Sequence, residues 1–192
     1  MCRHYGVIEL LKEIRIHGRG GQGNVTASEF LAEAAFADGL NAQSFPMFGS
    51  ERHGAPVTAY VRISDRPIRL RSQIYEPDYV IVQDASLFSG TDVLEGLRDG
   101  GLIVINSSRP ASGFAIPDKF KVVAIPATEL ALEIVGKPII NTIMVGAFAA
   151  ASGEIRLEAL EKSVRERYPG ELGEKEIVAM RRAFERVEGA RR

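Results

Sequence analysis

Gly18, Gly20 and Gly23 have the G-x-G-x-x-G spacing of a phosphate-binding turn. The turn follows an alternating, strand-like segment at residues 13–17 and leads into a helical pattern that begins near Asn24. At such a junction the glycines let the backbone approach a phosphate, and unpaired amides at the start of the helix donate hydrogen bonds to it. The same spacing also fits a ligand-free turn that packs a helix close to a sheet. The candidate phosphate-binding residues are Gly18, Arg19, Gly20, Gly21, Gln22 and Gly23.

Small polar side chains follow three further apolar segments, at the points where we expect strands to end. They are Asp84-Ala85-Ser86, Asn106-Ser107-Ser108 and Thr128, which come after residues 79–82, 102–105 and 121–125. In an open parallel sheet the carboxyl ends of the strands line one crevice, so these groups predict an anion or nucleotide pocket. Each group also has a structural interpretation, Asp84 as a helix N-cap and Asn106 with its serines as a turn.

A dinucleotide site of the Rossmann type is a weaker interpretation of the glycine turn. Such a site requires an acidic residue about 20 positions beyond the glycines, at the end of the second strand, to bind the ribose. The second strand, expected over residues 41–45, ends instead in Phe45 and Pro46. Asp38 comes before this strand, and Glu51 lies within the loop that follows it. A free-standing NAD-binding oxidoreductase is therefore an alternative that rests on the glycine spacing alone, and the phosphate loop of NTPases is absent from the sequence.

Residues 46–56 form a second distinctive segment, because they have no hydrophobic period and contain two prolines and two glycines. A loop of this length in a compact domain usually binds something. Phe48 is suited to anchor a partner chain, although it could also fold back into local core. Glu51, Arg52 and His53 offer an acid, a fork-shaped donor and a titratable ring, or else a solvated surface turn. The candidate partner-interface residues are Phe48, Gly49, Glu51, Arg52, His53 and Gly54.

The remaining periodicity predicts the elements that position these groups. Strands are expected at residues 13–17, 41–45, 57–63, 79–82, 102–105 and 121–125, and helices after residue 24 and at residues 129–135, 141–151, 157–168 and 177–187. A turn at residues 64–67 predicts that residues 57–63 and 68–70 form an antiparallel hairpin. The chain is therefore expected to form one domain over residues 1–192. Its expected fold is an α/β three-layer α/β/α sandwich with a mostly parallel (mixed) sheet and an inserted antiparallel hairpin.

Composition argues against several classes of function. A net charge of −1 at pH 7 gives no overall attraction to nucleic acid or anionic membranes. The uncharged residues 138–153 fall short of the roughly 20 apolar residues of a membrane span, and charges at residues 9, 12 and 13 interrupt any signal-peptide core, so we expect a cytoplasmic protein. The single cysteine, Cys2, cannot hold an iron–sulfur cluster, which takes about four thiolates. The histidines have no metal-binding spacing, so the sequence predicts no metal site, and it contains no nucleophile elbow or paired catalytic carboxylates, so it predicts no catalytic residue either.

Two sequence blocks resemble the gamma subunits of 2-oxoacid:ferredoxin oxidoreductases. Residues 14–23 (IRIHGRGGQG), followed by VTA at 25–27, are similar to the opening of that family, and residues 45–57 (FPMFGSERHGAPV) resemble its second block. Residues 126–129, 137–142, 146–148 and 173–175 are also similar, so the resemblance extends from about residue 13 to about residue 184. The first two blocks are far more specific than a glycine fingerprint alone.

The resemblance implies a multisubunit enzyme that converts pyruvate, coenzyme A and oxidised ferredoxin into acetyl-CoA, CO2 and reduced ferredoxin, or runs in reverse. It implies that alpha, beta and delta subunits are the partners of this chain. Thiamine diphosphate with Mg2+ would be held by the alpha and beta subunits, and iron–sulfur clusters by beta and delta. This chain would complete the active site and be inactive alone. MFG at 47–49 and RHGAP at 52–56 look like the pyruvate and branched-chain group, so a 2-oxoisovalerate enzyme is the alternative.

The resemblance also suggests roles for the two blocks. The loop from Gly18 to Gly23, with Arg19, is hypothesised to hold the phosphates of coenzyme A. The segment from Phe48 to His53 is hypothesised to contact the alpha and beta subunits. A further alternative is a non-enzymatic assembly module without a ligand, which differs only in whether coenzyme A touches this chain.

Overall fold

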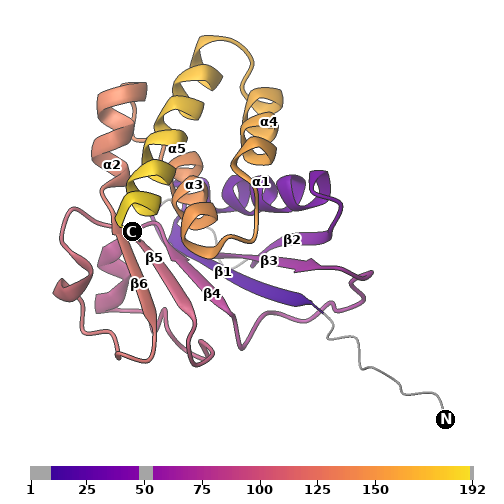
Figure 1. Cartoon of the computed structure of the whole chain (residues 1–192). Coiled ribbons are helices and arrows are strands. Elements are labelled where there is room, and N and C mark those ends of the chain that lie inside the picture. Colours follow the sequence, from indigo (N-terminus) through magenta and orange to yellow (C-terminus); the bar gives the residue numbers. More distant parts are fainter. Residues whose placement is uncertain (1–9, 48–53, 191–192) are drawn as a thin grey trace.

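A six-stranded mixed sheet with strand order β2-β3-β1-β4-β5-β6 forms the centre of the protein (Figure 1). The structure is a computed structural model, and it describes residues 10–47 and 54–190. Its strands are β1 Leu11–Arg19, β2 Asn41–Met47, β3 Pro56–Ser64, β4 Tyr79–Val82, β5 Leu102–Asn106 and β6 Lys121–Ile125. Strands β1, β4, β5 and β6 run parallel, whereas β3 lies antiparallel between β1 and β2. The four parallel strands therefore end at the same edge of the sheet.

The alternation of side chains explains how the strands use their two faces. Ile14 of β1 is fully buried in the main core, while its neighbour Arg15 points to the opposite face and is 7% exposed. Strand β4 is apolar at successive positions because both of its faces are covered. Its Val80 and Ile81 belong to two different core clusters. This is the pattern of a central parallel strand.

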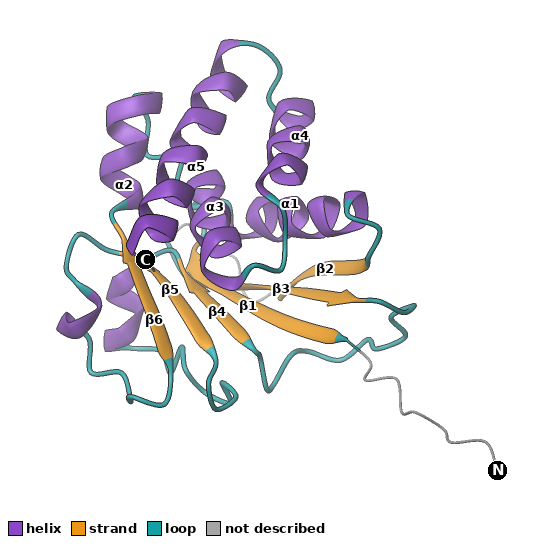
Figure 2. Ribbon diagram, in the orientation of Figure 1, coloured by secondary structure: helices purple, strands orange, loops and turns teal. Residues whose placement is uncertain are grey.

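The α-helices cover one face of the sheet (Figure 2). They are α1 Asn24–Ala37, α2 Ala127–Leu130, α3 Asn141–Ser152, α4 Leu157–Arg167 and α5 Glu171–Ala190, and α2 continues into a π-helical segment, Ala131–Val135. Helix α3 is apolar around nearly its whole circumference because it packs between the sheet and α5. Gly146 allows this contact, since a Cβ atom there would lie 2.8 Å from the carbonyl oxygen of Met180. In the part of the chain that the structure describes, no helix is long and apolar enough to cross a membrane.

The opposite face of β4 and β5 carries a thinner layer. The 3-10 helices Ala85–Ser89 and Ala111–Gly113, with their flanking loops, lie on this side of the sheet (Figure 2). Together with nearby loops they cover a second apolar cluster that includes Val80, Val82 and Ile103. The α/β fold with a mixed sheet is thus confirmed, with long helices on one face and short helical turns on the other.

The antiparallel pairing differs from the predicted hairpin. Residues 68–70 form no strand, because β3 is already paired with β2 on one edge and with β1 on the other. The segment after Ser64 instead runs as an irregular strap against the face of the sheet opposite the α-helices. Strands β2 and β3 also extend to Met47 and Pro56, so the predicted loop at residues 46–56 is shorter than expected. The predicted strands at residues 79–82 and 121–125 agree with β4 and β6 at both ends.

A buried ion pair connects β1, β3 and the strap. The guanidinium of Arg62 is 1% exposed and donates to Glu13 Oε1 at 2.8 Å, while Arg98 approaches the second oxygen of Glu13 at 3.5 Å. Arg62 also donates to the carbonyl oxygens of Ser72 and Gln73, at 2.9 and 3.4 Å. A buried charge is tolerated only when it is paired and hydrogen-bonded. The pair therefore joins these three segments into one unit.

Candidate functional site

The predicted glycine loop joins the carboxyl end of β1 to the start of α1. Gly21 and Gly23 have φ angles of 94° and 75°, which side chains other than glycine rarely adopt. The amide of Gly20 donates to the carbonyl oxygen of Ala55 at 2.9 Å, and the amide of Gln22 donates to that of Arg19 at 3.0 Å. The loop is therefore held as a tight turn against the segment that precedes β3. The amides of Gly21 and Gly23 have no hydrogen-bond partner among the described residues.

Two of the glycines also permit close packing beneath the turn. A Cβ atom on Gly18 would lie 2.2 Å from Asn24 Oδ1, and one on Gly23 would lie 2.7 Å from Asn141 Nδ2. Asn24 is the first residue of α1, and Asn141 is the first residue of α3. Gly18 and Gly23 therefore serve close packing, as the ligand-free interpretation of the glycine spacing requires. The amides of Gly21 and Gly23 have no partner among the described residues and remain available to a ligand.

Arg19 is the charged centre of this edge of the sheet. Its guanidinium donates to Asp84 Oδ2 at 2.9 Å, to Ser86 Oγ at 2.7 Å and to the carbonyl oxygen of Gly54 at 3.1 Å. Asp84 caps the 3-10 helix Ala85–Ser89 by accepting the amide of Ser86 at 2.9 Å, so its N-cap interpretation is confirmed. Burial alone would raise the pKa of Asp84, but the hydrogen bonds from Ser86 and Arg19 outweigh it and lower that pKa. The carboxylate is therefore ionised and holds Arg19 in place.

A second set of polar contacts connects β5 to the start of α2. The side-chain nitrogen Nδ2 of Asn106 donates to the carbonyl oxygen of Gln83 at 3.0 Å and to Thr128 Oγ1 at 2.9 Å. In return, the backbone amide of Thr128 donates to Asn106 Oδ1 at 3.2 Å. Ser107 accepts the amide of Arg109 in the turn that follows β5. The strand-end groups predicted from the sequence therefore lie next to one another.

These groups surround a cavity of about 410 Å³. Its lining residues are Gln22, Gln83, Asp84, Ala85, Ser86, Asn106, Ser107, Ser108, Arg109, Pro126, Thr128 and Glu129. The predicted strand-end groups therefore converge on one crevice at the edge where the parallel strands end. Of the predicted phosphate-binding loop, only Gln22 lines the cavity, and Arg19 borders it through Asp84 and Ser86.

Gln83, Arg109 and Glu129 line this cavity without having been predicted from the sequence. Gln83 is fully buried, and neither atom of its side-chain amide has a hydrogen-bond partner among the described residues. Buried polar groups are normally paired, so an unpaired amide marks a place where water or a ligand completes the structure. A polar residue directly after the apolar run of β4 is the signal that could have identified Gln83.

The cavity is lined by hydroxyl groups, by side-chain amides, by the carboxylates of Asp84 and Glu129 and by the cation of Arg109. His17, the one histidine among the described residues, is buried in the sheet. Burial, with a smaller effect of Arg15, lowers the pKa of His17 to about 3, so the imidazole stays neutral. Across residues 10–47 and 54–190, no three His, Cys, Asp or Glu side chains are grouped so as to hold a metal ion.

The predicted partner-interface residues Phe48, Gly49, Glu51, Arg52 and His53 lie outside the described residues. Gly54 is exposed, has a φ angle of 82° and accepts a hydrogen bond from Arg19 through its carbonyl oxygen. Gly54 therefore lies beside the glycine loop.

Strand topology argues against the Rossmann alternative. In that fold the strand after the first helix lies next to β1 and parallel to it, which brings its terminal acid to the ribose. Here β2 lies at the far edge of the sheet, and the antiparallel strand β3 occupies the position beside β1. The end of β2 is therefore separated from the glycine turn by a full strand.

Comparison with known proteins places these features in a family. The family model "Pyruvate ferredoxin/flavodoxin oxidoreductase" matches residues 13–186. The chain is 53% identical over 155 residues to the pyruvate synthase subunit PorC of Methanosarcina barkeri, covering 81% of this chain and 85% of that protein. It is 49% identical over 180 residues to the pyruvate/ketoisovalerate oxidoreductases common subunit gamma of Thermococcus litoralis, covering 91% of this chain and 96% of that one.

A solved structure supports the same relationship. The crystal structure of the pyruvate oxidoreductase subunit PORC of Thermotoga maritima superimposes with a TM-score of 0.79 at 35% identity, covering 91% of this chain and 96% of that chain. The resemblance inferred from the two sequence blocks is thereby confirmed. The chain belongs to the pyruvate ferredoxin/flavodoxin oxidoreductase family.

Proposed function

We propose that this chain is the gamma subunit of a multisubunit pyruvate:ferredoxin oxidoreductase. The complex would convert pyruvate, coenzyme A and oxidised ferredoxin into acetyl-CoA, CO2 and reduced ferredoxin, or catalyse the reverse reaction. The observation that carries this proposal is the identity of about half of the residues with pyruvate synthase subunits over most of both chains. With ferredoxin as its acceptor, the complex is proposed to act in the cytoplasm.

The proposal places the redox groups on other subunits. Thiamine diphosphate, Mg2+ and iron–sulfur clusters are assigned to the alpha, beta and delta subunits, because a chain with one cysteine cannot ligate a cluster. This chain's own contribution is to bind and to position.

Reconstitution of the complex tests the main proposal. The remaining subunits are purified without this chain, and reduction of a viologen dye is measured with pyruvate and coenzyme A before and after the chain is added. We expect the chain alone to be inactive and its addition to restore the activity. Full activity without the chain, or turnover by the chain alone, would refute the assignment.

For coenzyme A, we propose that the phosphates bind at the Gly18–Gly23 loop beside Arg19. The support is the strand–turn–helix position, the unpaired amides of Gly21 and Gly23 and the absence of a side-chain cap on α1. Arg19 is 35% exposed despite its hydrogen bonds, so its cation faces the solvent at this edge. The amides of Gly20 and Gln22 already donate to the carbonyl oxygens of Ala55 and Arg19, which leaves the amides of Gly21 and Gly23 and the cation of Arg19 as the principal donors.

Calorimetry on the assembled complex tests the coenzyme A site. Arg19→Ala and Gly20→Ala are expected to weaken coenzyme A binding. The matched control is Arg98→Ala. Arg98 is also a partly exposed arginine that forms ion pairs, but its partners, Asp78 and Glu13, lie at the opposite ends of the strands. If Arg19→Ala and Gly20→Ala both bind coenzyme A as tightly as the wild type does, this loop has no part in phosphate binding.

The segment from Phe48 to Gly54 is proposed as the contact with the alpha and beta subunits. Its support is its sequence, together with the hydrogen bond that joins Gly54 to Arg19 at the candidate site. Phe48→Ala and Arg52→Ala should weaken assembly of the complex, as measured by native mass spectrometry. Normal assembly and activity of both variants would remove this assignment.

A second candidate function is a gamma subunit shared with a 2-oxoisovalerate enzyme. The observation in its favour is that the relatives from Thermococcus and Pyrococcus, named as common subunits of pyruvate and ketoisovalerate oxidoreductases, are 48–49% identical to this chain. Purification of every complex that contains the chain, followed by assays with both oxoacids, separates the two. Activity with pyruvate alone would exclude the shared role.

A further inference from the structure

The strap formed by residues 65–73 is fixed at both of its ends. At the start, the amide of Leu10 donates to Asp65 Oδ1 at 3.2 Å, and the amide of Asp65 donates to the carbonyl oxygen of Leu10 at 3.3 Å. At the other end, the buried guanidinium of Arg62 holds the carbonyl oxygens of Ser72 and Gln73. The residues between these points are therefore presented by an anchored backbone, and any surface they form is preorganised.

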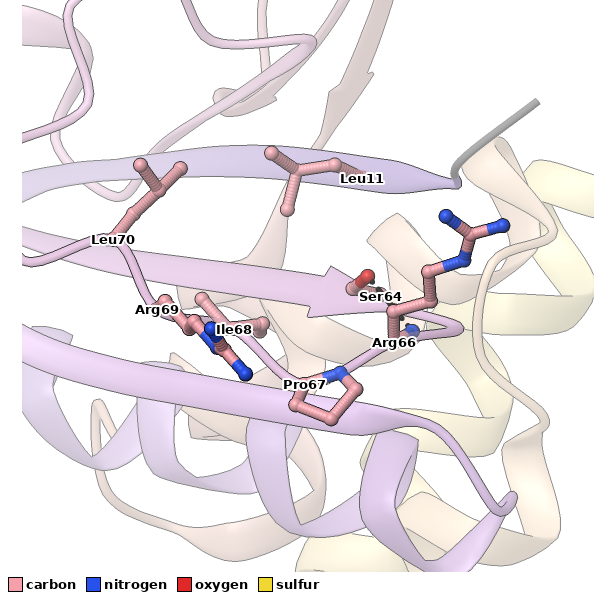
Figure 3. A pocket seen from close by; sticks show the side chains of 7 residues that line it. All are labelled: Leu11, Ser64, Arg66, Pro67, Ile68, Arg69 and Leu70. Carbon is pink, nitrogen blue, oxygen red and sulfur yellow. Dashed lines mark hydrogen bonds between the residues drawn. The ribbon is translucent and has the colours of Figure 1, made fainter. Parts of the chain in front are cut away.

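A groove of about 620 Å³ lies between the strap and the start of β1, at Leu11 (Figure 3). We call it the strap groove. Its walls include the apolar side chains of Leu11, Pro67, Ile68 and Leu70, and Leu70 is 46% exposed. A second hollow of about 470 Å³ adjoins it, because Ile68 and Leu70 line both. Apolar walls that are exposed on an anchored segment are typical of a surface that another chain covers.

The strap groove is bordered by unpaired positive charge. Arg66, Arg69 and Arg71 lie within six residues, and their guanidinium groups form no ion pair or hydrogen bond with described residues. Figure 3 shows the guanidinium groups of Arg66 and Arg69 extending from the strap at different points around the groove. Arg62 and Arg98, on the same side of the sheet, are instead paired with carboxylates. The unpaired cations of Arg66 and Arg69 at the apolar groove, with that of Arg71 at the adjoining hollow, favour a ligand that is both acidic and apolar.

We propose that the strap groove is the docking site for an extended segment of another subunit of the oxidoreductase, in which an apolar side chain is flanked by acidic ones. The apolar residue would lie against Ile68 and Leu70, and the carboxylates would pair with Arg69 and Arg71. Bidentate pairing of arginine with carboxylate makes such a contact specific. The proposal rests on the proposed function only for the origin of the partner.

The groove fits other ligand classes less well. A free phosphate would gain nothing from the apolar walls of Leu11, Pro67, Ile68 and Leu70. Nucleic acid usually needs aromatic side chains on which bases stack, and none lines either hollow. A second copy of this chain is a possible occupant that the experiment below distinguishes.

The test is a binding titration with the full chain. Fluorescently labelled chain is added to the other subunits of the complex, and the dissociation constant is measured by anisotropy for the wild type and for R69E/R71E. The matched control is R182E/R186E, two exposed arginines of α5 on the opposite side of the sheet that also lack partners among the described residues. Thermal melts of both variants check that they are folded.

We expect R69E/R71E to weaken association by about tenfold or more, since each like-charge contact disfavours the complex, while R182E/R186E stays near the wild-type value. A photo-crosslinking residue at position 70 of the assembled complex should then attach to an acidic segment of another subunit, identified by mass spectrometry. Equal dissociation constants for both variants, or crosslinks to a second copy only, would overturn the docking site. Failure of the wild-type chain to associate at all would instead refute the proposed function.

Discussion

Substitution of Gly18 by alanine tests whether packing against Asn24 or ligand binding explains the first glycine of the loop. The new Cβ atom would lie 2.2 Å from Asn24 Oδ1 and 2.8 Å from Nδ2. Asn24 is 3% exposed and its amide donates to the carbonyl oxygen of Val57 at 3.2 Å, so it cannot retreat without losing that bond. Overpacking costs about 1–3 kcal/mol, and a lost hydrogen bond costs about 1 kcal/mol more. We therefore expect a destabilisation of about 2–4 kcal/mol.

A double-mutant cycle identifies the contact responsible. Asn24→Ala alone should cost about 1 kcal/mol, because it removes the bond to Val57 but also removes a buried oxygen that has no partner among the described residues. In the double variant the space is free, so we expect a loss smaller than the sum of the two by about 1–2 kcal/mol. Urea denaturation of the purified chains, followed by circular dichroism, gives the four free energies of unfolding.

Two results would refute this reasoning. Additive effects, within about 0.5 kcal/mol, would show that Asn24 is not the obstacle. The second result is a Gly18→Ala chain that is as stable as the wild type but no longer supports coenzyme A binding in the complex. Gly18 would then be required for ligand binding and not for packing.

Further predictions concern three buried charged or titratable groups. Arg62→Met should lower the free energy of unfolding, measured by urea denaturation, by about 3–5 kcal/mol, because it leaves Glu13 buried with only the partly exposed Arg98 as a partner. Glu13→Gln in the same chain should recover part of this loss. A change below about 1 kcal/mol for Arg62→Met would contradict the buried pair. Burial raises the pKa of Glu176 above its ordinary value of 4.5, so the folded chain binds this proton more tightly than the unfolded chain and loses stability as the pH rises above 4.5. Glu176→Gln should therefore raise the melting temperature at neutral pH but not at acid pH. An equal effect of the substitution at both pH values would refute this reasoning. The ring of His17 should show no protonation by NMR at any pH above about 4, whereas a midpoint near 6.5 would mean that it is not buried.

Most of the candidate site followed from residue order. Polar side chains placed directly after apolar strands have to meet at one edge if the strands are parallel, and Asp84, Asn106 and Thr128 do line one cavity. Gln83 and Arg109 were missed because a single polar residue at a strand end or in a turn looks the same whether it faces solvent, core or cavity. Only the packing of α1, α2 and the strand ends around them distinguishes these cases.

The sequence by itself determined the approximate positions of the six strands and of the long helices, that a glycine turn joins β1 to α1, and to which family the chain belongs. Those properties depend on local periodicity and on short motifs, both of which involve residues that are close together in the sequence. Only the tertiary structure decided that β3 lies between β1 and β2, because strand neighbours are chosen by contacts between distant residues such as Arg62 and Glu13. That choice leaves no free edge on β3, and so the residues after it form the strap with its groove instead of the predicted hairpin.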